Sequence, residues 1–359
     1  MSCPACGATV GAIDQFCESC GASLVEVGDG VATLMADAPP ATTGELSAVD
    51  QSTGAIAAVS GSGPKPCSCG GAIDADGWCT VCGLRGPSER DHFTEQPAPN
   101  VAAVCDKGLV HGRNEDAVAL AATDGRVVMV VCDGVTSSTD SDVASMASAR
   151  AARDVLAGTD PSDAPPNARA DRWMDALEQA TGAAQDAAVA AAAAVGAREN
   201  PPSCTFVAAV VDGSTLVAGW LGDSRCYWFG EDGESLQVSV DDSWATEQIA
   251  RGIDRKDAER DPRAHGITRW LGVDAPTRVP SSTSISVAAG GWVLVCSDGL
   301  WNYRSAASEL GQLVTETAAR VGPEPLAVAG ALCDWANEQG GHDNITVALL
   351  RVGSRRDTP

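Results

Sequence analysis

Four short apolar runs in this chain each lie within two residues of an aspartate. The pairs are 126–132 with Asp133, 214–221 with Asp223, 292–296 with Asp298, and 345–350 with Asp343. Runs of this length and composition are typical of buried strands, so the four carboxylates are predicted to lie at strand ends. Rigid strands fix the spacing of such carboxylates, and their oxygens suit hard cations such as Mg²⁺ or Mn²⁺. One Asp-Gly pair alone would indicate only a turn, whereas four such aspartates indicate a cation site.

The sequence around these runs predicts further strands and several helices. The runs 205–211 and 214–221 flank Asp212-Gly213, which is a strong signal for a β-hairpin. Apolar residues at three- and four-residue spacing predict helices over about 143–155, 171–195 and 306–340. The expected buried faces are Val143, Met146, Ala147, Ala151 and Val155 in the first, and Trp173, Leu177, Ala180, Ala184 and Ala188 in the second. Strands and helices in separate blocks predict an α+β fold with layered antiparallel sheets.

Eight of the 14 cysteines lie in the first 82 residues, in four close pairs. The pairs form two groups, Cys3, Cys6, Cys17 and Cys20, and then Cys67, Cys69, Cys79 and Cys82. Two pairs on tight turns supply four thiolates to a tetrahedral Zn²⁺, and a glycine follows the second cysteine of every pair. We therefore predict two small zinc ribbons, each with one structural Zn²⁺. Disulfides or uncoordinated thiols are the alternative, which the regular spacing disfavours.

The two groups of cysteines also divide the chain into domains and linkers. Residues 1–24 and 67–86 are the two predicted ribbons. Residues 25–66 are rich in small, polar and acidic residues, which predicts a flexible linker. Residues 87–100, with three prolines, are interpreted as a second linker. The main domain is predicted to occupy residues 101–353.

Composition and charge limit where such a chain works and what it binds. The other six cysteines stand singly among apolar residues and are expected to be small buried hydrophobes in a reducing compartment: Cys105, Cys132, Cys204, Cys226, Cys296 and Cys333. The first residues lack the features of a secretory signal, and no apolar run approaches the roughly 20 residues that span a bilayer. We therefore expect a cytoplasmic protein with no membrane partner. A net charge of −24 argues against a nucleic-acid partner.

The aspartates belong to longer motifs that follow one another in a fixed order. These are Asp106-Lys-Gly108, Arg113-Asn-Glu-Asp116, Asp133-Gly134, Ser203-Cys-Thr205, Gly222-Asp-Ser-Arg225, Thr268-Arg-Trp-Leu-Gly272, Ser297-Asp-Gly299 and Asp343-Asn-Ile-Thr346. In order and spacing they resemble the type 2C, or PPM, family of metal-dependent Ser/Thr protein phosphatases over essentially all of residues 101–352. The resemblance implies an αββα sandwich, in which two antiparallel sheets are flanked by helices.

The resemblance also implies a set of metal ligands. Asp133 would bridge two ions, either Mn²⁺ or Mg²⁺. Asp298 and Asp343 would complete the ligands of one ion. Glu115 and the backbone carbonyl of Gly134 would complete those of the other.

Further roles follow from the same resemblance. Asp223, together with Asp298, would match a weaker third metal site, and Asp116 would orient the attacking water. Residues 242–266 would form a mobile flap beside the site. The implied reaction is in-line attack on phosphorus by a water that two metal ions activate, without a covalent phosphoenzyme.

The chain departs from the family pattern at the residue that binds phosphate. That residue is an arginine four positions before the metal-ligand glutamate, and here His111 stands at this position before Glu115. Arg113 is the nearest arginine. Either residue is a candidate for the phosphate contact, and we favour Arg113 because its charge is permanent.

A second departure concerns the proton donor to the leaving group. Val135 follows Asp133-Gly134, where animal members of the family carry a histidine. The candidate donors are His111, His265, His342 and a metal-bound water, whereas His92 falls in the predicted second linker. For each histidine taken singly, a structural or solvated side chain is the favoured interpretation.

These residues predict an enzyme that hydrolyses phosphoserine and phosphothreonine in proteins and opposes a Ser/Thr kinase. The alternative is a pseudophosphatase that acts as a signalling scaffold, which the missing arginine keeps open. A third possibility, ribbons that bind nucleic acid beside an enzyme, is disfavoured because neither ribbon is notably basic. Docking of a protein partner or regulation is the expected role of the ribbons.

Overall fold

The computed structural model describes residues 67, 69–75, 77–83, 85–123, 125–162, 164–165, 168–196, 199–264 and 266–353. The predicted ribbon at residues 1–24, with Cys3, Cys6, Cys17 and Cys20, and the predicted linker 25–66 lie outside the described residues. The chain divides into two compact units, and the boundary between them falls between Pro87 and Ser88.

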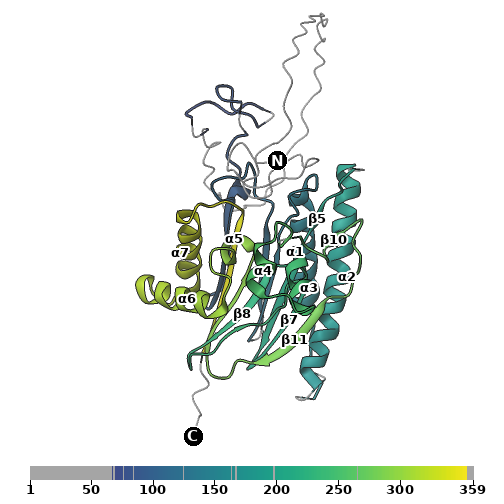
Figure 1. Cartoon of the computed structure of the whole chain (residues 1–359), viewed down its shortest axis with the longest axis vertical. Helices are drawn as coiled ribbons and strands as arrows, with labels where there is room; N and C mark the ends of the chain where they lie inside the picture. The colour runs from purple at the N-terminus through teal and green to yellow at the C-terminus, as the bar shows by residue number, and fades with distance from the viewer. Residues whose placement is uncertain are drawn as a thin grey trace, which may run out of the picture. The chain divides into compact units, whose positions relative to one another are not determined.

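The larger unit contains two antiparallel sheets (Figure 1). The six-stranded sheet has the order β1 (His92–Ala98), β2 (Val101–Asp106), β13 (Ile345–Val352), β12 (Gly291–Cys296), β8 (Arg225–Gly230) and β9 (Ser235–Gln237). The five-stranded sheet has the order β11 (Ser281–Ser286), β7 (Thr215–Leu221), β6 (Phe206–Asp212), β4 (Arg126–Cys132) and β3 (Ala117–Thr123). A short pair joins β10 (Leu271–Gly272) to β5 (Ser203–Cys204).

Helices cover the outer face of each sheet (Figure 1). The five-stranded sheet is covered by α1 (Ser141–Gly158) and α2 (Arg169–Val195). The six-stranded sheet is covered by α5 (Asp298–Trp301), α6 (Ala307–Val321) and α7 (Pro325–Glu338). Two short helices, α3 (Trp244–Ala250) and α4 (Arg255–Arg260), lie in the segment between β9 and β10, and a 3₁₀ turn, η1 (Glu89–Asp91), precedes β1. The predicted αββα sandwich is therefore confirmed.

Burial on both faces explains why the strands are continuous apolar runs. In β4, Val127, Met129 and Val131 point into the core between the two sheets. The alternate residues Val128 and Val130 point into the core under α1 and α2. A strand buried on one face would alternate apolar with polar residues, whereas β4 has no solvent face to fill. The six scattered cysteines are buried free thiols, as expected: Cys105, Cys132, Cys204, Cys226, Cys296 and Cys333.

The predicted helices exist, but two details of the prediction were wrong. In α1 the predicted face is only partly buried, and the fully buried residues are small: Ser141, Ala144, Ser145, Ser148, Ala149, Ala152 and Leu156, the last being the exception in size. Ser141 and Ser145 on this face donate hydrogen bonds to Glu115, and Ser148 donates to the Ala184 carbonyl in α2, so apolar periodicity does not mark this face. The stretch 306–340 is two helices, because Gly322 has a φ of 99° and Pro325 begins the next helix.

The prediction that residues 87–100 form a second linker was also wrong. This segment contains η1 and β1, and β1 pairs with β2 at the edge of the six-stranded sheet. Proline lacks an N–H donor, so Pro97 is tolerated on this edge strand, where the register with β2 shifts between Glu95 and Ala98. The ordered domain therefore begins at Ser88 rather than at Val101. Among the described residues, no helix is long and apolar enough to cross a membrane.

Candidate active site

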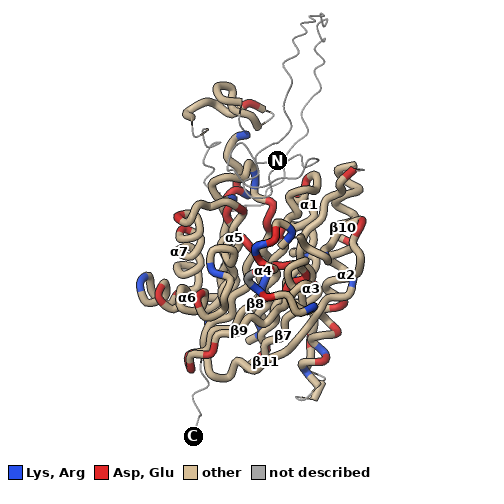
Figure 2. Tube along the Cα trace, in the orientation of Figure 1, with Lys and Arg blue, Asp and Glu red and all other residues tan. Residues whose placement is uncertain are grey.

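The two sheets bring the predicted acidic residues to one place. Asp133 follows β4, Asp223 follows β7, Asp298 begins α5 just after β12, and Asp343 precedes β13. Each of these carboxylates acts electrostatically on at least one of the others. In the view of Figure 2, acidic segments drawn in red gather with a few basic ones around the α4 and α5 labels. Residues up to 210 positions apart in sequence thus form one cluster.

Burial and mutual repulsion disfavour negative charge on this cluster. Burial raises the pKa of Asp133 and of Asp298 well above the ordinary range, and the neighbouring carboxylates raise both further. The pKa of Asp223 is raised to about 7, first by burial and then by the charge of Asp241. The pKa of Asp116 is raised by burial to about 6. Such a cluster is stable in its charged form only with cations beside it.

Two carboxylate oxygens of the cluster accept no hydrogen bond from any residue that the structure describes. Asp116 accepts hydrogen bonds from Ser297 Oγ and Thr346 Oγ1 at its Oδ2, both at 2.7 Å. Its Oδ1 is buried without a donor, and so is Oδ1 of Asp298. Buried polar atoms normally have partners, and here the Asp133 carboxyl is the acidic group beside both Asp116 and Asp298. A cation or a water that the cation orders fits both positions.

Glu115, another predicted metal ligand, is held by three hydrogen bonds. Its main-chain N–H donates to Asn344 Oδ1 at 2.7 Å. Its Oε1 accepts hydrogen bonds from Ser141 Oγ at 2.6 Å and from Arg113 Nε at 3.1 Å. Gly134 packs so closely that an added Cβ would lie 2.7 Å from the Glu115 carbonyl oxygen, so any larger residue would displace it. This donor set of carboxylates and a backbone carbonyl fits the hard divalent cations that the sequence predicted.

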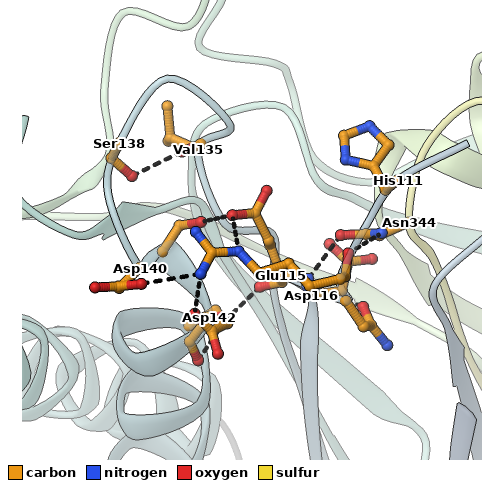
Figure 3. Close-up of polar contacts among 12 residues, drawn as sticks. His111, Glu115, Asp116, Val135, Ser138, Asp140, Asp142 and Asn344 are labelled. Atoms are coloured by element: carbon orange, nitrogen blue, oxygen red, sulfur yellow. Dashed lines mark hydrogen bonds and ion pairs between the residues drawn. The ribbon is translucent and has the colours of Figure 1, made fainter. Parts of the chain in front are cut away.

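The two candidates for the phosphate contact have different partners, and Figure 3 shows His111 apart from Asp140 and Asp142. Arg113 Nη1 lies 2.9 Å from Asp140 Oδ1 and 3.5 Å from Asp142 Oδ1, at the start of α1. With Glu115 as a third partner, its Nε and Nη1 both contact acids. His111 lies apart from this group, with Nε2 3.3 Å from Asp343 Oδ1 and a side chain only 12% exposed. The geometry therefore disfavours our preference for Arg113 and favours His111.

The other candidates for the leaving-group acid are less well placed. His342 is exposed, and its main-chain N–H donates to the Tyr303 hydroxyl at 3.1 Å. His265 lies outside the described residues. His92 lies in β1, not in a linker, and bonds to Asp106 at 2.6 Å. Val135 offers no side-chain donor.

The predicted flap, residues 242–266, lies next to the cluster, and its two ends are hydrogen-bonded to each other. Its base is tied by hydrogen bonds from Trp244 N to Gly266 O and from Thr268 N to Asp242 O, both at 2.8 Å. A cavity of about 190 Å³ lies between α3, α4 and the end of α5, and Asp223 contributes to its wall. A substrate bound at the carboxylates would therefore lie against the flap.

Two supporting residues were missed by reasoning from the sequence. Asn344 belongs to the quoted Asp343-Asn-Ile-Thr346 motif, but only the structure shows that it holds the main chain at Glu115. Asn302 Nδ2 donates to Asp298 Oδ2 at 2.9 Å and lies outside every quoted motif. Its position one turn after Asp298 on α5 was the available signal, because residues four apart on a helix share a face.

In the smaller unit, the second group of cysteines forms a compact set. The Sγ atoms of Cys67 and Cys82 are 3.5 Å apart, and those of Cys69 and Cys79 are 3.4 Å apart. All four Sγ atoms lie within 4.8 Å of one another. In the part of the chain that the structure describes, no three carboxylates bring their oxygens that close together. The main-chain N–H groups of Cys82 and Val81 lower the pKa of Cys79 to about 6, which favours the thiolate that metals bind.

Residues 110–335, more than half of the chain, match the family model described as protein phosphatase 2C. The chain belongs to the protein phosphatase 2C family. It is 30% identical over 252 residues to the serine/threonine protein phosphatase PstP of Mycobacterium tuberculosis, covering 70% of this chain and 44% of that protein. It is 33% identical over 152 residues to the serine/threonine phosphatase stp of Listeria innocua, covering 42% of this chain and 57% of the relative. The chain thus spans about half the length of these relatives.

Solved structures of protein phosphatase 2C relatives agree with the fold. The crystal structure of the Mycobacterium tuberculosis phosphatase PstP/Ppp is 27% identical, with a TM-score of 0.56, covering 70% of this chain and 97% of that chain. Another structure, the catalytic domain of PstP in complex with two manganese ions, is 25% identical with a TM-score of 0.53, covering 70% and 98%. Stp1 from Staphylococcus aureus has a TM-score of 0.61 at 20% identity, covering 73% and 98%, and supports the fold alone.

The raised carboxylate pKa values predict that the metal-free domain loses stability as pH rises. Between the ordinary pKa near 4 and the raised values of about 6 for Asp116 and about 7 for Asp223, the folded chain binds more protons than the unfolded chain. The free energy of unfolding therefore falls as pH rises through this window. Thermal unfolding in chelator at pH 5 to 8 should show a falling midpoint, which Mn²⁺ restores.

The control separates the cluster from the general negative charge. Asp223→Asn should flatten the pH dependence in chelator, whereas Glu178→Gln, on the exposed face of α2, should leave it unchanged. A metal-free midpoint that stays constant from pH 5 to 8 would contradict the prediction.

Proposed function

We propose that this chain is a metal-dependent hydrolase of phosphoserine and phosphothreonine in proteins. The observation that carries the proposal is the cluster of buried, mutually repelling carboxylates with two unpartnered oxygens. Membership of the protein phosphatase 2C family supports it, as do relatives named as serine/threonine phosphatases and a related domain that binds two manganese ions.

The ligand sets follow from the positions of the carboxylates. Asp133 would be shared by two Mn²⁺ or Mg²⁺ ions. Glu115 and the Gly134 carbonyl would hold one, and Asp298 and Asp343 the other. Bound there, such ions make a hydroxide available at neutral pH and neutralise charge on the phosphoryl oxygens. Asp223, which faces the cavity beside Asp298, would serve a weaker third ion.

The remaining steps are carried by residues of the chain itself. Asp116 Oδ2 is fixed by Ser297 and Thr346, so its free Oδ1 is positioned to accept a proton from the attacking water and orient it. His111 borders the cluster and would donate a hydrogen bond to a phosphoryl oxygen. Fixed donors of this kind stabilise developing charge at no cost in reorganisation.

The histidine at the phosphate position also supports a second candidate, a scaffold that binds phosphoproteins but turns them over slowly. Loss of a bidentate guanidinium weakens binding of a dianion. All the carboxylates are nevertheless present, and six hydrogen bonds with neutral side chains hold Glu115, Asp116 and Asp298 in place, which a scaffold does not need. We therefore favour hydrolysis. Asn344 accepts one of the six bonds, and the other five are donated by Ser141, Ser145, Ser297, Thr346 and Asn302.

The N-terminal unit completes the proposal. Cys67, Cys69, Cys79 and Cys82 would hold one structural Zn²⁺, and the cysteines of residues 1–24 a second. The ribbons would dock a protein partner, such as the Ser/Thr kinase that the enzyme opposes or its targets. A cytoplasmic location, with neither membrane nor nucleic acid as a partner, agrees with the free buried thiols and the net charge of −24.

Removing a shared metal ligand should abolish turnover. Asp133→Asn and Asp298→Asn should each lower the rate of hydrolysis of a phosphothreonine peptide in Mn²⁺ by about a thousandfold or more, because the activated water is lost. The unfolding midpoint in Mn²⁺ should show that both variants are folded. Asp175→Asn, on the exposed face of α2, is the control and should match the parent. Chelator should abolish the activity of the parent, and activity that survives chelator would refute the proposal.

His111 and Arg113 should differ in their effect on substrate binding. His111→Ala should raise KM for the phosphopeptide about tenfold, and His111→Arg should restore or improve binding, because a guanidinium bonds phosphate with two N–H groups. Arg113→Ala should leave KM within about threefold, because Asp140 and Asp142 already engage that side chain. The opposite ranking of the two alanine variants would show that Arg113 turns toward the substrate.

The cysteine groups should bind zinc independently of catalysis. Protein purified under reducing conditions should contain two zinc ions per chain by elemental analysis, and Cys67→Ser with Cys79→Ser should reduce this to one. Cys333→Ser, a buried thiol in α7, is the control and should leave two. Deletion of residues 1–86 should leave hydrolysis of a small substrate nearly unchanged. A freshly purified chain without zinc would refute the ribbons.

A further inference from the structure

Arg90 lies in the short turn that begins the larger unit, directly after the cysteine-containing unit ends at Pro87. The turn is fixed by a capping box, in which Arg90 N–H donates to Ser88 Oγ at 3.2 Å and Ser88 N–H donates to Asp91 Oδ2 at 3.0 Å. Its end is tied to the rest of the unit by a hydrogen bond from Lys107 N to Asp91 O at 2.7 Å. The backbone at Arg90 is thus held by contacts that do not involve the Arg90 side chain.

The guanidinium of Arg90 bonds the main chain on both sides of Glu115. Nε donates to the carbonyl of Asn114 at 2.9 Å, and Nη2 donates to the carbonyl of Asp116 at 3.0 Å. Nη2 also donates to Ser145 Oγ at 3.2 Å, and Ser145 Oγ donates to the carbonyl of Glu115 at 2.5 Å. Three consecutive carbonyls are therefore satisfied by Arg90, two directly and one through Ser145.

Asn114 bonds back to Arg90, and Asn344 supports the same stretch of main chain through an N–H group. Asn114 Nδ2 donates to the Arg90 carbonyl at 2.9 Å, and Asn114 Oδ1 accepts the N–H of Asp116 at 3.2 Å. Asn344 receives the N–H of Glu115 at 2.7 Å. The peptide units around Glu115 are thus bonded through their carbonyls to Arg90 and Ser145, and through their N–H groups to Asn344 and Asn114.

Because the bonded groups are buried, the loss of these hydrogen bonds would cost free energy. Asn114 and Asp116 are 1% and 0% exposed, so water cannot replace a lost donor at their carbonyls. The planar guanidinium places two N–H groups at fixed spacing, which the ammonium of lysine cannot reproduce. Residues that orient metal ligands from outside typically change metal affinity 10- to 100-fold when they are mutated.

We propose that Arg90 is a positioning residue for the metal site, which fixes the Asn114–Asp116 main chain and through it the carboxylates of Glu115 and Asp116. The inference rests on the proposed function only in taking Glu115 as a metal ligand and Asp116 as its neighbour. It makes the turn Ser88–Asp91 a support of the metal site, and in sequence this turn directly follows the cysteine-containing unit.

The test compares the full-length chain with its Arg90→Gln and Arg90→Lys variants. Titration calorimetry of the metal-free proteins with Mn²⁺ should show affinity at least about tenfold weaker in Arg90→Gln and intermediate or equal weakening in Arg90→Lys. At saturating Mn²⁺, KM for a phosphothreonine peptide should stay within about twofold, because Arg90 does not touch substrate. The matched control is Arg126→Gln, since Arg126 also donates to a main-chain carbonyl, that of Thr159 at 3.1 Å, but outside the site.

A second readout does not depend on turnover. Hydrogen exchange in the metal-free chain should accelerate at the amides of Glu115 and Asp116 in both Arg90 variants, and in Ser88→Ala with Asp91→Ala, which loosens the turn. Should Arg90→Gln unfold, the Lys variant and the turn variant carry the test. Mn²⁺ affinity within twofold of the parent in Arg90→Gln, or in both remaining variants if it unfolds, would overturn the inference. If the parent fails to hydrolyse phosphopeptide while the Arg90 variants still lose Mn²⁺ affinity, the proposed function fails and Arg90 keeps its role.

Discussion

Repulsion among buried carboxylates is the interaction on which the rest of this structure depends. Two packed sheets deliver Asp133, Asp223, Asp298 and Asp343 from different strand ends into one cluster, where burial raises the pKa of the first three. The sandwich can hold such a cluster because its strands are apolar on both faces and the cores on each side of each sheet fix their positions. The charge remains uncompensated until cations arrive, which couples the stability of the domain to its cofactor.

Two nearby arginines offset this charge only in part, because each also bonds to acids outside the cluster. Arg113 bonds to Glu115 but also to Asp140 at the start of α1. Arg225 is buried against Asp241 at 2.6 Å, with its guanidinium 3.4 Å from the centre of the Trp301 ring. Neutral side chains and bonds to the main chain orient the carboxylates, such as the bond from the Glu115 N–H to Asn344 and the bond from Arg90 to the carbonyl of Asn114. Neutral donors orient a carboxylate without removing its attraction for a metal ion, so this arrangement preserves affinity.

The residue at the family's phosphate-binding position differs in this chain, although all the proposed metal ligands are present. Replacing the family's arginine by His111 leaves Glu115, Asp133 and Gly134 in place, because those residues are fixed by the sheets and by α1. In our proposal the substitution changes the phosphate contact, and it also places an imidazole beside Asp343, whose Oδ1 lies 3.3 Å from Nε2. Phosphate binding and metal affinity would therefore both respond to a change at His111, whereas the scaffold and enzyme hypotheses differ in turnover.

The sequence by itself determined five central strands, because they are short apolar runs, and the aspartates that flank four of them; its resemblance to a known family implied the αββα layering. It missed the edge strand β1, because the prolines of residues 87–100 favoured a linker. It did not reveal the serine-rich buried face of α1 or the ordered turn at 88–91, since hydrogen bonds to a distant main chain leave no periodic signal. It also could not show where Arg113 and His111 point. Their directions depend on acids at Asp140 and Asp343, which are far away in sequence and become neighbours only when the sheets pack, so the tertiary structure decided which of the two side chains contacts Asp343.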